Sequence, residues 1–419
     1  AKKWKICAPS AARIMPAPCW VQKQKPRDTA FPICKTGHRP ESEHAMRRAF
    51  ICPSKYVQGE NELLNLGYFV RQYGTSALLV ATSSSVKRVR EALDATAAKF
   101  GVTFVETDFQ GECSRDEIAR LGELARKHSC HCTVGLGGGK ALDTARCVAA
   151  GQGLIVVPTT AATDAPTSHS AVIYKPNGEM EDYAYFPRNP DVVLMDVSII
   201  AASPVRYLVS GMGDALSTYF EARATRRSCS AVNAGLPCGA RTGDCPPARG
   251  TLAAQALAST CYRILLEDGY KAVLACQAKM ATPALENVIE ANSLLSGLGF
   301  ESGGLAAAHA IHDGLTALEE THAYLHGEKV AFGTLAQLVL ENAPTEEIEE
   351  VLEFCTTVGL PVCLKDIGVT DISADDLRKV ARKACLPEES IHAMPFPITE
   401  DSVAAAILSA DALGNAYRS

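Results

Sequence analysis

The stretch CTVGLGGGK, residues 132–140, decides the fold of this chain because it joins an apolar strand to a helix through a turn of glycines. Residues 132–134 predict a buried strand, and a helical pattern follows the turn as far as Val148. Backbone N–H groups at the start of such a helix can hold a phosphate. The turn is neither GxGxxG, because Lys140 takes the third glycine's place, nor a P-loop. It predicts either a flexible strand–helix turn or a dinucleotide site.

Apolar runs alternate with helical patterns on both sides of this turn. Strands alternating with helices of this length predict a parallel sheet covered on both faces. At the carboxyl ends of such strands, a dinucleotide site becomes the better interpretation of the glycine turn. The other expected strands are residues 77–80, 102–105, 154–157 and 191–195, the expected helices are 86–100 and 114–128, and a hairpin joins 171–173 to 180–183.

Strand patterns end near residue 205, and helical periodicity continues from there to the C-terminus. The predicted fold class is therefore α/β: a parallel-sheet dinucleotide-binding domain over 49–205, followed by an all-α metal-binding domain over 206–419. Residues 226–250 contain prolines, glycines and three cysteines, and they predict a loop inserted in the second domain. Residues 1–48 form a basic extension, interpreted either as a tail of the mature protein or as the remainder of a targeting segment.

Composition excludes several classes of partner. The net charge is −6 and no basic stripe stands out, so we expect no nucleic acid. No run of 18 apolar residues occurs, so we expect no membrane span. The 16 cysteines are scattered without a CxxC pair, which indicates mostly reduced thiols of an intracellular protein. The expected compartment is the cytoplasm, or an organellar matrix if the extension is a processed targeting segment.

Polar residues gather in three stretches. Residues 158–168 directly follow the strand 154–157 and are placed either to bind a polar ligand or to make an ordinary capping turn. Two later stretches put a carboxylate and histidines in surroundings rich in Gly, Ala and Leu, where burial is costly unless they pair or bind a cation. Each histidine alone is more often a core or surface residue, but together they predict a divalent-metal site. They are Asp214, His309, His312, His322 and His326.

Several long motifs resemble the glycerol-oxidising members of the metal-dependent, iron-containing alcohol dehydrogenase superfamily. The resemblance covers about residues 49–419 apart from the insertion, and the number of long matches in one order makes it specific. The motifs are GGGKALDTA (137–145), VPT (157–159), TDAPTS (163–168), FPRNPD (186–191), SGMGDAL (210–216), GFESGGLAAAH (299–309) and HGEKVAFG (326–333).

The resemblance implies a dehydroquinate synthase-like fold with zinc bound by Asp214, His309 and His326. It implies that Asp164 contacts the substrate hydroxyls. We expect His312, three residues after His309, to support the site or relay protons rather than to bind the metal. The nucleotide contacts are implied for Gly137, Gly138, Gly139, Lys140, Thr159, Ser168, Ser170 and Tyr174.

Three positions depart from the superfamily's usual residues. Thr218 stands where the iron enzymes have a further histidine, so three protein ligands leave an open fourth position, as in a catalytic zinc site. Ser170 stands where relatives usually have Leu. Thr82 stands where many relatives carry an Asp for the adenosine ribose. NAD is the implied nucleotide, and Thr82 leaves NADP open as an alternative.

The predicted reaction is the reversible, NAD-linked oxidation of glycerol or a related vicinal diol, with dihydroxyacetone as the product from glycerol. Asp164 would hold a neighbouring hydroxyl and orient the substrate.

The rival is a same-fold enzyme on a phosphorylated substrate, a glycerol-phosphate dehydrogenase or a dehydroquinate synthase-like lyase. Such an enzyme needs several cations for the phosphate, and the motifs offer little beyond Lys329. A non-enzymatic binding protein ranks third, because the metal ligands are intact. The expected partners are a small polyol and other copies of the chain in a homo-oligomer.

Overall fold

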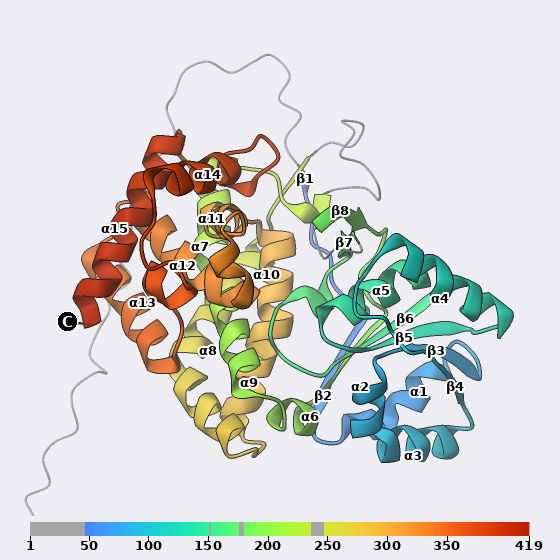
Figure 1. Cartoon of the computed structure of the whole chain (residues 1–419). Helices are drawn as coiled ribbons and strands as arrows, with labels where there is room; N and C mark the ends of the chain where they lie inside the picture. The colour runs from blue at the N-terminus through green and yellow to red at the C-terminus, as the bar shows by residue number, and fades with distance from the viewer. Residues whose placement is uncertain (1–46, 151, 176–179, 236–246, 419) are drawn as a thin grey trace, which may run out of the picture. The chain divides into compact units, whose positions relative to one another are not determined.

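Six parallel strands form the sheet of the first half of the chain (Figure 1), in the order β2-β9-β6-β5-β3-β4. The sequence predicted five of them and missed β2, because this edge strand is only partly buried and has no apolar run. The inner strands β5, β6 and β9 are buried along their whole length, as expected for a sheet covered on both faces. The strands are β2 (Lys55–Gly59), β3 (Ser76–Val80), β4 (Thr103–Glu106), β5 (Cys132–Gly137), β6 (Gly153–Pro158) and β9 (Val192–Asp196).

The computed structural model describes residues 47–150, 152–175, 180–235 and 247–418. The extension predicted over 1–48 lies outside these residues except at its last two positions. Residues 236–246 of the predicted insertion also lie outside them.

Each face of the sheet packs into its own apolar core. In β3, Leu78 and Val80 belong to one core, while Ala77 and Leu79 belong to the other, because successive side chains of a strand point to opposite faces. The helix predicted over 86–100 is divided at Val89, whose backbone leaves the helical region. The helices of this half are α1 (Leu66–Val70), α2 (Ser83–Arg88), α3 (Arg90–Phe100), α4 (Arg115–Lys127), α5 (Gly139–Ala149) and α6 (Val197–Ala201).

The glycine turn begins later than the sequence predicted. Gly135 still belongs to β5, and the strand pairs with β6 as far as Gly137 opposite Pro158. A Cβ on Gly135 would lie 2.7 Å from the Cβ of Ala145, so α5 packs directly on the strand where a side chain would intervene. Close helix–strand packing is one of the roles of glycine in dinucleotide-binding turns.

Two small sheets accompany the central one. The predicted hairpin is confirmed as β7 (Ser170–Tyr174) and β8 (Met180–Tyr185), which pair antiparallel. The short strand β1 (Arg47–Arg48) pairs in parallel with β10 (Ala248–Arg249). The expectation that strands end near 205 is therefore wrong for β10, a two-residue strand too short to leave a pattern.

Helices dominate the described chain after residue 204, as predicted. α7 (Val205–Ser228) extends three residues into the predicted insertion and packs among α8, α10 and α12 (Figure 1). Among the described residues, no helix is long and apolar enough to cross a membrane. The others are α8 (Leu252–Gln277), α9 (Pro283–Glu290), a π-helical turn (Ala291–Leu295), α10 (Ser296–Gly303), α11 (Ala307–Leu315), α12 (His326–Leu340), α13 (Thr345–Val358), α14 (Ala374–Ala384) and α15 (Glu400–Arg418).

Gly211 lets α7 approach the segment that follows β6. A Cβ there would lie 1.9 Å from Ala161 O and 2.4 Å from Asn292 Nδ2. Gly211→Ala should therefore lower the free energy of unfolding by about 2–3 kcal/mol through overpacking. The control is Gly122→Ala on α4, where the nearest atom is the flexible Arg126 guanidinium at 3.6 Å. This change should stabilise the protein by about 0.4–1 kcal/mol. Equal effects of the two substitutions in denaturant unfolding would contradict the close approach.

Candidate active site

Three candidate metal ligands from distant parts of the chain meet at one point. Asp214 is fully buried in the middle of α7, His309 lies on α11, and His326 is the first residue of α12. Asp214 Oδ1 is 3.3 Å from His309 Nε2 and 3.2 Å from His326 Nε2. Ligand atoms of the three residues lie within 4.8 Å of one another. His322 is not among them, because it is exposed and donates from Nε2 to the Thr316 carbonyl.

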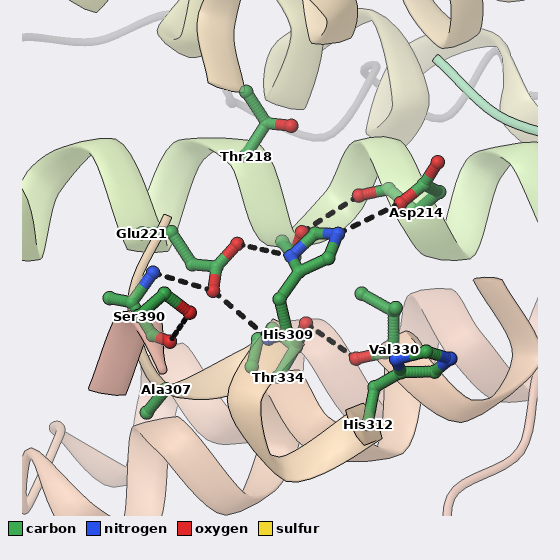
Figure 2. Close-up of polar contacts among 12 residues, drawn as sticks. Asp214, Thr218, Glu221, Ala307, His309, His312, Val330, Thr334 and Ser390 are labelled. Carbon is green, nitrogen blue, oxygen red and sulfur yellow. Dashed lines mark hydrogen bonds and ion pairs between the residues drawn. The ribbon is translucent and has the colours of Figure 1, made fainter. Parts of the chain in front are cut away.

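Glu221 orients His309 and was missed by the sequence analysis. It lies seven residues after Asp214, two turns along the same face of α7, and it is fully buried. Its Oε2 is 2.6 Å from His309 Nδ1, and its Oε1 accepts the backbone N–H groups of His309 and Ala306. Figure 2 shows Glu221 reaching from α7 to the imidazole of His309. The seven-residue spacing of the two acids was a signal in the sequence.

His312 holds the second imidazole in a similar way. His326 Nδ1 lies 3.1 Å from His312 Nε2, and His312 Nδ1 lies 3.1 Å from Asp313 Oδ1. Burial is the main cause that lowers the pKa of His312, to about 4, so its imidazole is neutral at pH 7. The structure thus places His312 behind His326, away from the point where the three candidate ligands meet.

These hydrogen bonds determine which imidazole nitrogens carry protons. A carboxylate can only accept a hydrogen bond. We therefore assign the proton of His309 to Nδ1, which donates to Glu221, and this leaves Nε2 unprotonated. Asp313 likewise takes the Nδ1–H of His312, whose Nε2 then accepts from His326 Nδ1. His326 Nε2 is therefore also bare. Two nitrogen lone pairs and a carboxylate oxygen converge without a proton between them, which requires added protons or a cation. The donor set fits a divalent metal.

Asp164 lies directly beside this cluster. Its backbone N–H donates to Asp214 Oδ2 at 3.1 Å, and its Oδ2 accepts from Ser296 Oγ at 2.8 Å. Ser296 Oγ is in turn 2.8 Å from Thr218 Oγ1. Burial, with the charge of Asp214, raises the pKa of Asp164 well above its usual range. Thr218 points to the opposite side of α7 from His309 (Figure 2), so it takes no part in the ligand cluster.

Five of the predicted nucleotide residues, Gly137 to Lys140 and Thr159, lie where β5 and β6 end, at the carboxyl edge of the sheet. A Cβ added to Gly138 or Gly139 would meet nothing within 4 Å, so the turn leaves open space at the start of α5. Lys140 forms an ion pair with Glu112, and its Nζ lies 5.1 Å from the ring centre of Tyr174. Thr159 follows β6 and donates its N–H to Gly137 O at 3.0 Å, next to the same turn. These residues offer a place where a phosphate can approach backbone N–H groups.

The Ser168 hydroxyl is hydrogen-bonded to groups of the protein. It lies 2.9 Å from Glu301 Oε1, and it accepts the N–H of Ser170 at 3.0 Å. The fully buried Glu301 also accepts from the N–H and Nδ1 of His169 and from Asn189 Nδ2. Glu301, which the sequence analysis did not single out, fixes this segment to α10.

Comparison with known proteins identifies the family of the chain. The family model described as iron-containing alcohol dehydrogenase matches residues 53–197. The glycerol dehydrogenase of Citrobacter freundii is 47% identical over 374 residues, which cover 89% of this chain and 99% of that protein. The crystal structure of a probable glycerol dehydrogenase from Sinorhizobium meliloti 1021 superposes with a TM-score of 0.78 at 44% identity, covering 88% and 99% of the two chains. That of the Schizosaccharomyces pombe glycerol dehydrogenase gives 0.83 at 35% identity, covering 89% and 93%.

The fold and these similarities define an oxidoreductase with an α/β half followed by a helical half. The chain belongs to the iron-containing alcohol dehydrogenase family. The resemblance predicted from the sequence motifs is thereby confirmed.

Glu221→Gln should weaken divalent-cation binding. The glutamine amide can donate to His309 Nδ1, which would move the imidazole proton to Nε2 and block the nitrogen that faces Asp214. We expect the dissociation constant for Zn²⁺, measured by calorimetry on metal-free protein, to rise about 10- to 100-fold. Glu267→Gln is the control, because this exposed acid pairs with Arg263 on the surface of α8. Unchanged affinity in Glu221→Gln would show that His309 is not a metal ligand or needs no orientation.

Proposed function

We propose that the chain catalyses the reversible oxidation of glycerol, and of related vicinal diols, with zinc as the metal and NAD as the nucleotide. Dihydroxyacetone is the product from glycerol. The observation that carries this proposal is the convergence of bare His309 and His326 nitrogens on Asp214, with the carboxylate of Asp164 beside them. Relatives named glycerol dehydrogenase at 45–47% identity support the substrate.

The ligand set favours zinc over iron. Asp214, His309 and His326 supply three protein ligands and leave a position open for substrate, as in catalytic zinc sites. Thr218 stands where the superfamily's iron enzymes are expected to have a further histidine, and its hydroxyl is bonded to Ser296 instead. When bound, zinc supplies a Lewis acid that lowers the pKa of the substrate hydroxyl, and NAD supplies the hydride acceptor.

Asp164 orients the substrate in this proposal. Ser296 holds one carboxylate oxygen, so the hydroxyl next to the reacting one can donate to the other. A divalent cation bound beside Asp164 would lower its pKa again, and the resulting carboxylate opposes a phosphorylated substrate, because an unscreened pair of like charges costs on the order of a few kcal/mol. Lys329, three residues after His326, is buried, and burial lowers its pKa. This charge distribution supports a neutral polyol over the phosphorylated rival.

His312 and the glycine turn have supporting roles. His312 Nε2 accepts the Nδ1–H of His326, and this bond holds the imidazole with its bare nitrogen toward the metal position. With its pKa near 4, His312 serves to orient His326 rather than to accept a proton at neutral pH. The open turn at Gly138 and Gly139 would bind the pyrophosphate of NAD through backbone N–H groups at the start of α5.

Metal analysis and a nucleotide-reduction assay test the proposal. The purified protein should contain stoichiometric zinc, reduce NAD with glycerol and with 1,2-propanediol, and respond weakly to glycerol phosphates. His326→Ala should lose metal and activity while keeping the far-ultraviolet circular dichroism of the folded chain. An active protein free of metal would refute the metal assignment. A higher specificity constant for a glycerol phosphate would establish the phosphorylated rival.

The path from Thr218 through Ser296 to Asp164 provides a sharper test of the Asp164 role. Ser296→Ala leaves a buried carboxylate oxygen without its donor, which costs about 1–3 kcal/mol, a loss of roughly 5- to 150-fold in kcat/KM for glycerol. Thr218→Val should lose about 3- to 10-fold, and Thr218→Ser should recover most of it. In the Ser296→Ala background, Thr218→Val should have almost no further effect. Additive effects, or loss of zinc in Thr218→Val, would contradict this connection.

A further inference from the structure

The chain builds the sheet outward from β3 in two opposite directions, and the change of direction falls between the neighbouring strands β3 and β5. From β3 the chain proceeds outward to β4 at one edge, then returns to β5 on the other side of β3 and continues through β6 to β9. In parallel sheets, such a reversal marks the place where a dinucleotide binds at the carboxyl ends of the strands. The glycine turn follows β5, so the segments after β3 and β4 are on the side where the adenosine ribose would lie.

The hydroxyl of Thr82, the residue expected at the ribose, is hydrogen-bonded to neighbouring residues at the start of α2. Its hydroxyl caps α2 by accepting the N–H of Ser85 at 3.2 Å, and it lies 3.1 Å from Ser84 Oγ and 3.0 Å from Ser85 Oγ. A hydroxyl engaged in this way has little left to offer a ribose. The acid that many dinucleotide sites place at this strand end is therefore absent from β3 itself.

Asp108 brings a carboxylate to the same place from the neighbouring strand. Its Oδ1 accepts from Ser83 Oγ at 2.8 Å, and the Ser83 N–H lies 3.4 Å away. The backbone is fixed on both sides, because the N–H groups of Thr107 and Phe109 donate to the carbonyls of Leu79 and Ala81. Asp108 is exposed, and among the described residues nothing donates a hydrogen bond to its Oδ2.

We propose that Asp108 selects NAD over NADP. Its carboxylate accepts a hydrogen bond from the 2′-hydroxyl of the adenosine ribose and repels a 2′-phosphate, the role that an acid at the end of β3 has elsewhere. This assignment rests on the proposed function, because it requires a nicotinamide dinucleotide at the carboxyl edge of the sheet.

Two cations on α2 act against this selection. Lys87 and Arg88 are exposed in the last turn of the helix, and Arg88 Nη2 donates to Ser85 Oγ at 3.3 Å. Asp108 contacts Ser83, the first residue of α2, whereas both cations lie a turn further along. Selection against NADP therefore depends on the carboxylate, and its removal leaves a surface that attracts a phosphate.

Calorimetric dissociation constants for NADH and NADPH, with the full-length chain, test the assignment. The wild type should bind NADH at least about tenfold more tightly, a difference of about 1.4 kcal/mol. Asp108→Asn keeps an acceptor for Ser83 but loses the charge, and it should bring the two constants within about twofold, mainly by tighter NADPH binding. Adding Thr82→Asp to Asp108→Asn should restore the preference, because aspartate also caps helices and returns a carboxylate to the site.

Asp94→Asn is the control for loss of one negative charge, because this exposed residue pairs with Arg90 on α3. It should leave the ratio of the two constants unchanged. A ratio unaffected by Asp108→Asn, or a wild type that prefers NADPH, would overturn the role of Asp108 while leaving the proposed oxidation intact. A wild type that bound neither nucleotide would overturn the proposed function and the role of Asp108 together.

Discussion

A carboxylate oxygen that faces two unprotonated imidazole nitrogens is the constraint on which the rest of the structure depends. Asp214 is fully buried, and its Oδ1 lies within 3.3 Å of both His309 Nε2 and His326 Nε2. Glu221 and His312 bind the far side of each imidazole and thereby direct both lone pairs inward. Burial of these groups without a cation would be strongly unfavourable. Three helices must therefore be held in register around one small volume.

Glycines allow the helices to approach closely where they cross, and this fixes their positions relative to one another. A Cβ on Gly327 would lie 1.8 Å from Ser210 O, and one on Gly213 would lie 2.3 Å from Gly327 O. The backbones of α7 and α12 therefore touch one residue away from Asp214 and His326. A side chain at either glycine would separate the two ligands. The close packing of the helical core therefore also determines the geometry of the candidate metal site.

Helix α10, which directly continues the π-helical turn, connects this cluster to the sheet edge. Ser296 holds the side chain of Asp164, and Glu301 holds Ser168. A Cβ on Gly297 would lie 1.8 Å from Thr167 Oγ1, so the segment between them rests directly on the helix. The carboxylate proposed to orient the substrate and the segment beside the nucleotide site are therefore positioned by one element. π-helical turns often occur at functional sites, because they shift side chains relative to a regular helix.

Local patterns in the sequence determined the alternation of strands and helices, the glycine turn and the motifs that carry the family resemblance. They did so because apolar periodicity and glycine preferences are properties of neighbouring residues. The edge strand β2 and the division of the helix at Val89 left no such pattern. Tertiary structure alone brought Glu221 to His309 and Ser296 to Asp164. It also brought Asp108, which follows β4, to the helix that follows β3. Each of these contacts joins residues at least 25 positions apart, so its distance depends on how helices and strands pack and not on any local preference.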